Sequence, residues 1–229
     1  MRYTAFVPAR SGSKRLPNKN VMDLAGKPLL VWTLQACMGA SQIDEVILST
    51  DSMEYYELAR DHLGSDKLCL DFREPDEAGD KVKIFDYLKE KREKIFGARD
   101  GAFILALPTA PLRKSVHVDE AISLYEEKGR PVFSATSYDF AVSFAFHVDS
   151  NDHWSTVFES NPMLTGNTRS QDQRETYHPN GAIYVRSIDD LNNEDLQTLY
   201  SEAVPYLMDR QDSIDIDNEI DFKIAEVLI

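Results

Sequence analysis

Short apolar runs alternate with amphipathic segments along the first 135 residues of the chain. The apolar runs predict strands at Arg2–Val7, Glu45–Ser49, Ala102–Leu107 and Val132–Ala135, and a short strand or extended loop at Cys69–Pro75. Helical spacing of apolar positions predicts helices at Pro28–Met38, Met53–Leu63, Lys81–Phe96 and His117–Lys128. Because strands and helices alternate in this way, we expect an α/β fold with a mostly parallel central sheet flanked by helices.

The pattern changes at Tyr138. Residues 138–176 hold clustered aromatic residues and then a polar stretch, and we expect them to form a small excursion that makes a subunit contact. A turn is predicted at His178–Gly181. Further strands are predicted at Ala182–Val185 and Ala203–Met208, and a closing amphipathic helix at Ile220–Leu228. We expect residues 1–229 to form a single domain.

Ligands of parallel α/β sheets bind beyond the carboxyl ends of the strands. Three polar segments directly follow predicted strands: Pro8–Asn20, the residues around Asp51, and Pro108–Arg113. We therefore expect these segments to meet at one edge of the sheet. Asp51 is also a candidate N-cap for the helix that begins at Met53.

The net charge of −14 argues against a nucleic-acid partner, which would require a basic face. The two cysteines, Cys37 and Cys69, lack the spacing of a metal site or a CxxC motif. No apolar stretch is long enough to cross a membrane, so we expect no membrane partner. The N-terminus also lacks a signal-peptide pattern. These features predict a cytoplasmic protein.

Four cations lie in the loop after the first strand, although the chain as a whole is strongly acidic. They are Arg10, Lys14, Arg15 and Lys19, and glycine and serine residues lie among them. Backbone N–H groups, hydroxyls and cationic side chains together bind phosphate, so the loop is a candidate phosphate site. The spacing of a P-loop is absent. A solvated charged loop is the alternative.

Asp215 and Asp217 flank one apolar residue near the end of the chain. On an extended segment, alternate side chains share a face, so the two carboxylates would lie together. Two carboxylates completed by substrate phosphates are a typical Mg²⁺ site. The alternative is an acidic first turn that complements the dipole of the last helix.

A third polar stretch contains Arg169 and Gln171, and Asn180 follows it. Arginine and amide side chains suit a ligand that carries a carboxylate and several hydroxyls, such as an acidic sugar. An ordinary polar surface loop is the alternative. None of the five histidines is assigned a catalytic role.

Taken together, these stretches resemble the acylneuraminate cytidylyltransferase family, the CMP-sialic acid synthetases. The resemblance is carried by Val7–Asn20, Gly26–Leu29, Ser49–Asp51, Pro108–Arg113, Arg169–Asp172, Pro179–Tyr184 and Asp212–Asp217. It implies a Rossmann-like nucleotide-diphospho-sugar transferase fold with a dimerisation excursion at 138–176, and hence a homodimer. It also implies transfer of CMP from CTP to the anomeric hydroxyl of a nonulosonic acid, a 2-keto sugar acid, with release of pyrophosphate.

The resemblance also implies roles for individual residues. The expected nucleotide-binding residues are Arg10, Ser13, Lys14, Lys19, Asn20 and Arg73. The expected sugar-binding residues are Arg169, Gln171 and Asn180, and the expected Mg²⁺ ligands are Asp215 and Asp217. Arg10, Lys19 and Asp217 would be catalytic.

The chain departs from the family pattern at two positions. Leu107 stands where the family often has Gln, and Ser170 stands where many members have Arg. Some stretches are similar to the pseudaminic acid branch and others to the sialic or legionaminic branch, so the acceptor sugar stays open. Kdo is a further alternative acceptor. From another class of protein, a nucleotide-sugar-binding protein or glycosyltransferase without cytidylyl transfer is also an alternative.

Overall fold

The structure is a computed structural model, and it describes residues 1–13 and 15–229. It divides into two compact units. The first contains Met1–Ala135 and Pro179–Ile229, and the second contains Thr136–His178. The second unit begins and ends within two residues of the excursion expected at 138–176.

A seven-stranded sheet forms the centre of the first unit, with strand order β11-β7-β10-β6-β1-β4-β5. The strands are β1 (Tyr3–Pro8), β4 (Glu45–Thr50), β5 (Leu68–Phe72), β6 (Ala102–Leu105), β7 (Val132–Ser137), β10 (Tyr177–Ser187) and β11 (Val204–Leu207). The pairs β6–β1, β1–β4, β4–β5 and β7–β11 are parallel, whereas β10 is antiparallel to β6. The expected mostly parallel α/β sheet is therefore confirmed.

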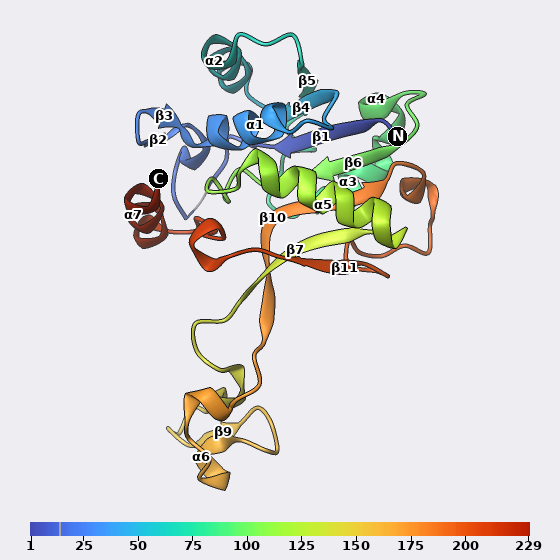
Figure 1. Cartoon of the computed structure of the whole chain (residues 1–229). Helices are drawn as coiled ribbons and strands as arrows, with labels where there is room; N and C mark the ends of the chain where they lie inside the picture. The colour runs from blue at the N-terminus through green and yellow to red at the C-terminus, as the bar shows by residue number, and fades with distance from the viewer. Residues whose placement is uncertain (14) are drawn as a thin grey trace. The chain divides into compact units, whose positions relative to one another are not determined.

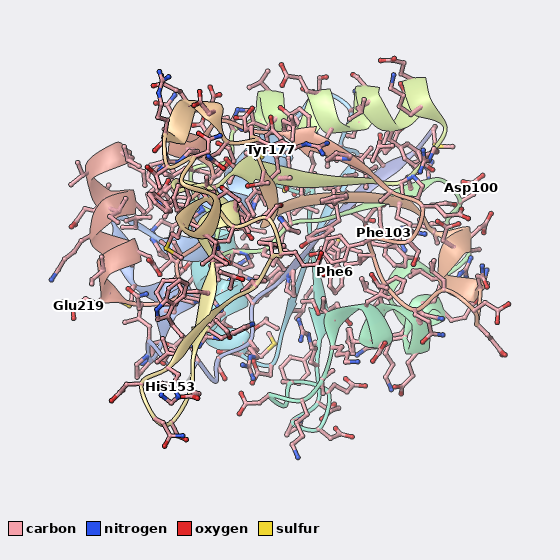
Figure 2. The ribbon with its side chains drawn as sticks, turned by 90° about the horizontal axis from the view of Figure 1, so that it is seen from below. Phe6, Asp100, Phe103, His153, Tyr177 and Glu219 are labelled. Carbon is pink, nitrogen blue, oxygen red and sulfur yellow. The ribbon has the colours of Figure 1, made fainter. Side chains whose placement is uncertain are left out.

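Helices cover both faces of this sheet (Figure 1). They are α1 (Leu29–Gly39), α2 (Met53–Leu63), α3 (Ile84–Glu90), α4 (Arg92–Phe96), α5 (Ser115–Lys128) and α7 (Glu219–Leu228). One core cluster joins α1, α2 and α5 to side chains of one sheet face, including Ala5 and Val7 of β1. Successive strand residues point to opposite faces, so the intervening Phe6 enters a second cluster with Phe103, α3 and α4 (Figure 2).

Short elements complete the first unit. They are η1 (Lys19–Val21), the two-stranded ribbon β2 (Asp23–Leu24) and β3 (Lys27–Pro28), η4 (Asp189–Asn192) and η5 (Arg210–Asp212). Helix α7 packs through Phe222 and Ala225 against Leu24, Leu29 and Ile216 in a third apolar cluster. That cluster fastens the end of the chain to the segment that follows the basic loop.

Three local expectations are wrong. The helix expected at Lys81–Phe96 is two helices, α3 and α4, which are separated at Lys91. Ser52 rather than Asp51 caps α2, because its side chain accepts a hydrogen bond from the Tyr55 amide. The turn expected at His178–Gly181 lies inside β10, where Gly181 adopts a φ of 71° that glycine tolerates without strain.

The second unit is built from small elements: η2 (Val142–Phe144), the antiparallel hairpin β8 (Phe146–Val148) and β9 (Trp154–Thr156), α6 (Pro162–Thr165) and η3 (Ser170–Asp172). Phe146 and Trp154 pack edge to face across the hairpin with their centroids 6.0 Å apart. Both rings nevertheless remain about half exposed. The unit thus leaves several large apolar side chains exposed.

Among the described residues, no helix combines the length and apolarity needed to cross a bilayer.

Candidate active site

The basic loop begins where β1 ends at Pro8 and is held by the strand beside it. Asp51 directly follows β4, the parallel neighbour of β1. Its carboxylate accepts hydrogen bonds from the Ser11 amide at 2.7 Å and from the Ser11 hydroxyl at 2.8 Å. The loop is therefore anchored at its start by Asp51, and these two segments meet at one edge of the sheet as expected.

Lys19 is positioned by a local turn and is largely buried. Asn18 adopts a left-handed φ of 56°, which asparagine tolerates better than most residues, and the single turn of η1 follows it. The Lys19 side chain is only 11% exposed and its ammonium donates to the Ile216 carbonyl. Burial lowers the Lys19 pKa, while the Asp217 and Asp215 charges oppose that shift. A solvated surface lysine does not have this environment.

A cavity of about 220 Å³ opens beside Lys19, past the carboxyl ends of β1 and β6. Its lining consists of Pro8, Arg10, Ser13, Lys19, Asn20, Leu107, Pro108 and Thr109. Four of the expected nucleotide-binding residues thus share one cavity. The Asn20 side chain donates to the Arg10 carbonyl at 2.9 Å, which links the two ends of the loop.

Carboxylates from other segments pair with the described cations of the loop. Arg10 contacts Asp80 at 2.5 Å, and Arg15 contacts Asp217 at 2.5 Å. Lys19 lies 3.8 Å from Asp217. A polyanion that enters this site can replace these carboxylates as the partner of the cations. Lys14, which was also expected here, lies outside the described residues.

The segment that carries Asp215 and Asp217 is fixed to the same cavity. The Ile216 amide donates to the Thr109 carbonyl at 2.8 Å, and the Ile216 carbonyl accepts from Lys19. Lys19 therefore connects the basic loop to this segment. The capping of α7 is done by Asn218 and Asp221, so that role does not fall to Asp215 or Asp217.

The two aspartates have the electrostatics of an incomplete cation site. Asp215 is exposed at the surface, yet surrounding protein removes part of its hydration, which raises its pKa. The Asp217 charge raises it further, while a hydrogen bond with Thr109 lowers it. Two neighbouring carboxylates of like charge fit a divalent cation, which would relieve the repulsion between them. The described residues hold no larger group of ligands that could bind a metal without substrate.

Arg73 lies just beyond the end of β5 and is 4% exposed. Its Nε donates to the Ser49 hydroxyl at 2.7 Å, and its guanidinium stacks over the Tyr87 ring. Burial lowers its pKa, and the charges of Asp51 and Arg10 also influence it. The Arg73 amide donates to the carbonyl of Thr50 at 2.9 Å, directly before the Asp51 that holds Ser11, although Arg73 does not line the cavity itself.

The expected sugar-binding residues are divided between the two units. The Asn180 side chain is buried and uses its hydrogen-bonding groups within the first unit. It donates to Ser213 at 2.9 Å and accepts from the Ser134 hydroxyl at 2.6 Å. Arg169 and Gln171 belong to the second unit, where Arg169 is exposed and lies 3.8 Å from Asp172.

Arg113 fixes the loop that follows β6, which contains Pro108–Arg113. It is 2% exposed, and its guanidinium donates to the carbonyls of Leu107 at 2.8 Å and Ala182 at 2.9 Å. These bonds fix Leu107 at the cavity. Leu107 also lies 3.2 Å from where a Cβ on Gly181 would stand. A larger residue at position 181 would therefore press on the cavity wall.

Comparison with known proteins identifies a family. The profile of the family described as Cytidylyltransferase matches residues 4–226. An N-acylneuraminate cytidylyltransferase of Escherichia coli O18:K1:H7 is 35% identical over 224 residues. That match covers 96% of this chain, but the chain spans only about half, 50%, of the relative's length.

Two further comparisons cover nearly the whole of both chains. A CMP-N,N'-diacetyllegionaminic acid synthase of Legionella pneumophila is 30% identical, with coverage of 100% of this chain and 97% of that protein. A solved CMP:2-keto-3-deoxy-manno-octonic acid synthetase complexed with CTP superposes with a TM-score of 0.68. It covers 100% of this chain and 98% of that one at 15% identity, so this likeness concerns the fold alone.

Proposed function

The chain belongs to the cytidylyltransferase family, and from this premise we propose that it transfers CMP from CTP to a nonulosonic acid. The observation that carries the proposal is the connection made by Lys19. Its ammonium lines the cavity of the basic loop and binds the segment that holds Asp215 and Asp217. A triphosphate site and its metal ligands would therefore be one structural unit.

In the proposed reaction the anomeric hydroxyl of the sugar acid attacks the α-phosphorus of CTP. A new phosphorus–oxygen bond forms to the sugar, and the bond to the bridging oxygen of the β-phosphate breaks. Pyrophosphate leaves with that electron pair, and the hydroxyl proton passes to solvent or base. Such transfer depends mainly on positioning and on neutralisation of developing charge, for which Arg10, Ser13, Lys14 and Lys19 are suited.

We propose that Asp215 and Asp217 hold Mg²⁺ together with oxygens of the nucleotide. When bound, the ion would neutralise charge on the phosphates. The chain's own part is to set the two carboxylates beside Thr109 and Lys19, as the hydrogen bonds of Ile216 do here. Arg15 must release Asp217 when the site fills, because the two now form an ion pair.

The acceptor is proposed to be a sialic-type acid, because the two relatives compared over most of this chain are named for N-acylneuraminate and for N,N'-diacetyllegionaminic acid. Arg169 and Gln171 are proposed to recognise its carboxylate and hydroxyls. Asn180, which is buried and internally bonded, would act by holding β10 against Ser213 rather than by direct contact. A nucleotide-sugar-binding protein without transferase activity would not need the Asp215–Asp217 segment, so we do not favour that alternative.

The test is pyrophosphate release by the full chain with CTP, Mg²⁺ and a panel of 2-keto sugar acids. The panel contains N-acetylneuraminic, legionaminic, pseudaminic and Kdo acids. We expect release that requires one nine-carbon acid and that fails with other nucleoside triphosphates. If no acid supports release, the enzymatic proposal is wrong, and release with Kdo alone would move the acceptor to an eight-carbon sugar.

We further propose that the second unit mediates a homodimer. Its exposed apolar side chains include Phe140 at 64%, Val148 at 60% and Leu164 at 62% exposure. A monomeric soluble protein rarely leaves so much apolar surface uncovered in so small a segment. Trp154→Ser should shift the protein from dimer to monomer in analytical ultracentrifugation, whereas a monomeric wild-type protein would refute the proposal.

A further inference from the structure

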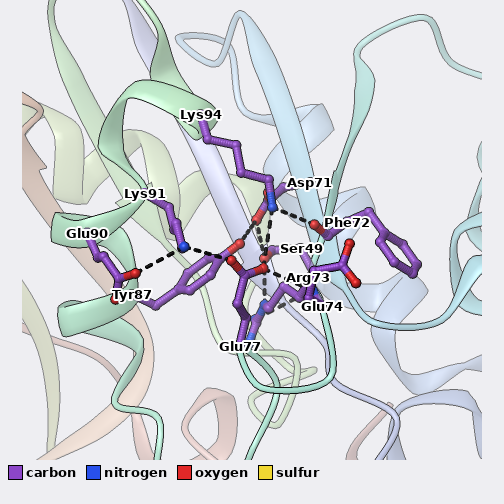
Figure 3. A network of polar contacts seen from close by, with 10 residues as sticks. All are labelled: Ser49, Asp71, Phe72, Arg73, Glu74, Glu77, Tyr87, Glu90, Lys91 and Lys94. Atoms are coloured by element: carbon purple, nitrogen blue, oxygen red, sulfur yellow. Dashed lines mark hydrogen bonds and ion pairs between the residues drawn. The ribbon is translucent and has the colours of Figure 1, made fainter.

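A polar network connects Arg73 with side chains of β4, β5, α3 and α4 (Figure 3). At its centre is Asp71, a β5 carboxylate that is only 5% exposed. One of its oxygens, Oδ2, accepts from the Ser49 hydroxyl at 2.6 Å and from the Tyr87 hydroxyl at 2.8 Å. The other oxygen, Oδ1, faces the Lys94 ammonium at 3.3 Å. An ionised carboxylate is costly to bury, so this arrangement calls for an explanation.

The network leads to Arg73 through one hydroxyl. The Ser49 hydroxyl donates to Asp71 and at the same time accepts from Nε of Arg73 at 2.7 Å. Because a hydroxyl has a single proton, the bond to Asp71 fixes its orientation and leaves its lone pair for Arg73. The chain of contacts therefore runs from carboxylate to hydroxyl to guanidinium.

Two further contacts restrict the guanidinium plane. Its Nη2 donates to the Ser49 carbonyl at 3.3 Å, and its carbon lies 5.0 Å from the centroid of the Tyr87 ring. Within the part of the chain that the structure describes, Nη1 of Arg73 donates to no side chain or carbonyl. Two nitrogens of Arg73, Nε and Nη2, are thus held by Ser49, whereas no such contact of a described residue holds Nη1.

The outer part of the network keeps Asp71 covered. Lys94 also donates to the Phe72 carbonyl at 2.6 Å and lies 3.5 Å from Glu77. Glu77 in turn pairs with Lys91 at 2.9 Å. These contacts hold the Lys94 ammonium beside the Asp71 carboxylate.

We propose that Asp71 is a positioning residue for nucleotide binding, which acts through the Ser49 hydroxyl to hold Arg73 in the orientation that contacts the nucleotide. The inference rests on the proposed function, because it takes the ligand of Arg73 to be CTP. Asp71 itself touches neither nucleotide nor sugar acid. Its effect should therefore fall on the affinity for CTP and not on the rate of the chemical step.

The decisive variant is Ser49→Ala, because it removes the hydroxyl that connects Asp71 to Arg73 and leaves the charges of both residues in place. We expect it to bind CTP about 10-fold more weakly in calorimetric titration, the loss typical of one hydrogen bond to a charged group. The value of kcat at saturating CTP should stay within about two-fold of wild type, since the reacting groups are untouched. Tyr87→Phe keeps the stacked ring, removes one bond to Asp71, and should cause a smaller loss in the same direction.

A double-mutant cycle separates positioning from a merely structural role. Arg73→Lys removes the hydrogen bond from Nε to the Ser49 hydroxyl, so adding Ser49→Ala to Arg73→Lys should weaken CTP binding little further. Additive losses would overturn the inference, and so would unchanged affinity in Ser49→Ala. Asp71→Asn should behave as Ser49→Ala does. Its matched control is Asp86→Asn, an exposed residue of α3, which should leave CTP affinity unchanged.

The outcome also distinguishes the inference from the proposed function. A wild-type protein that does not bind CTP contradicts both. If wild type binds CTP and Ser49→Ala binds it equally well, only the role of Asp71 is wrong. If Ser49→Ala instead lowers kcat and leaves the affinity for CTP intact, the contacts from Asp71 through Ser49 to Arg73 do not position the nucleotide, and the inference fails.

Discussion

Replacing Lys19 by methionine removes the charge that connects the basic loop to the Asp215–Asp217 segment. Methionine has a similar length and fills the same buried space, so the change is mainly electrostatic. In the structure the ammonium lies 3.8 Å from an Asp217 oxygen and donates to the Ile216 carbonyl. At an effective dielectric constant of about 20, the Coulomb energy at that separation is about 4 kcal/mol.

Part of that energy is offset because Lys19 loses hydration when it is buried, as its lowered pKa indicates. If the ammonium acts on the charge that develops on the phosphates at a similar separation, a net loss of about 3 kcal/mol in transition-state stabilisation is expected, which corresponds to a fall in kcat of the order of 10²-fold. This range also matches what removal of one preorganised donor costs other enzymes. CTP affinity should fall as well, because the same charge faces the triphosphate before reaction.

The assay is the initial rate of pyrophosphate release at saturating CTP and sugar acid, with circular dichroism to establish folding. Lys223→Met is the control, because it removes the same charge from an exposed position on α7. We expect the control to match wild type. A folded Lys19→Met protein with kcat within about three-fold of wild type would refute the electrostatic reasoning, which requires a loss at least ten times larger.

Asp217→Asn should reduce turnover by about 10²-fold with the fold retained, because a metal ligand is lost; near-normal rates across a magnesium titration would remove this residue from the metal site. Asp51→Ala releases the Ser11 amide and hydroxyl, so it should raise the KM for CTP several-fold, about the effect of 1–2 kcal/mol, and an unchanged KM would show that the loop needs no such anchor. Glu77 is held by Lys91, which lowers its pKa from 4.5 to about 2. Its contribution to stability is therefore complete above pH 4.5 and lost as the pH falls toward about 2. Glu77→Gln should lower the free energy of unfolding by about 1 kcal/mol at neutral pH. It should also flatten the acid part of a plot of melting temperature against pH. If the melting temperature of Glu77→Gln falls with pH in parallel with that of wild type, this assignment of the acid dependence to Glu77 is contradicted.

The apolar pattern was sufficient to predict the sheet. Runs such as Ala102–Leu107 are apolar throughout because β6 is covered on both faces, so the sequence carries a direct signature of its position. The family resemblance implied that Arg10, Ser13, Lys19 and Asn20 would bind one nucleotide, and they line one cavity. These features depend on local composition and on the general rule for the strand ends of parallel sheets.

Polar contacts between distant segments could not be predicted in this way. The strand-end rule placed Asp51 near the basic loop, but the two hydrogen bonds that its carboxylate accepts from Ser11 were not predicted. Asn180 looks like part of a turn, yet its bonds to Ser134 and Ser213 hold it inside β10. Sequence spacing gives no signal for such partners, which are tens of residues away along the chain.

Asp71 shows the same limit at a buried site. In the sequence it is one acid within an expected strand or extended loop, and nothing nearby indicates that it would be buried. The contact with Ser49 requires β4 and β5 to be adjacent, and the contact with Tyr87 requires α3 to pack beneath them. The burial of this carboxylate, which costs free energy, can therefore be recognised only once the fold is known.

The origin of the oxygen that bridges sugar and phosphorus tests the proposed reaction most directly. The sugar acid can be labelled with heavy oxygen at its anomeric hydroxyl by exchange with labelled water, and then incubated with CTP, Mg²⁺ and the protein. Mass spectrometry should find the label in a CMP-sugar, with unlabelled pyrophosphate formed in equal amount. Label in pyrophosphate, or no CMP-sugar from any acid of the panel, would contradict attack by the anomeric hydroxyl on the α-phosphorus.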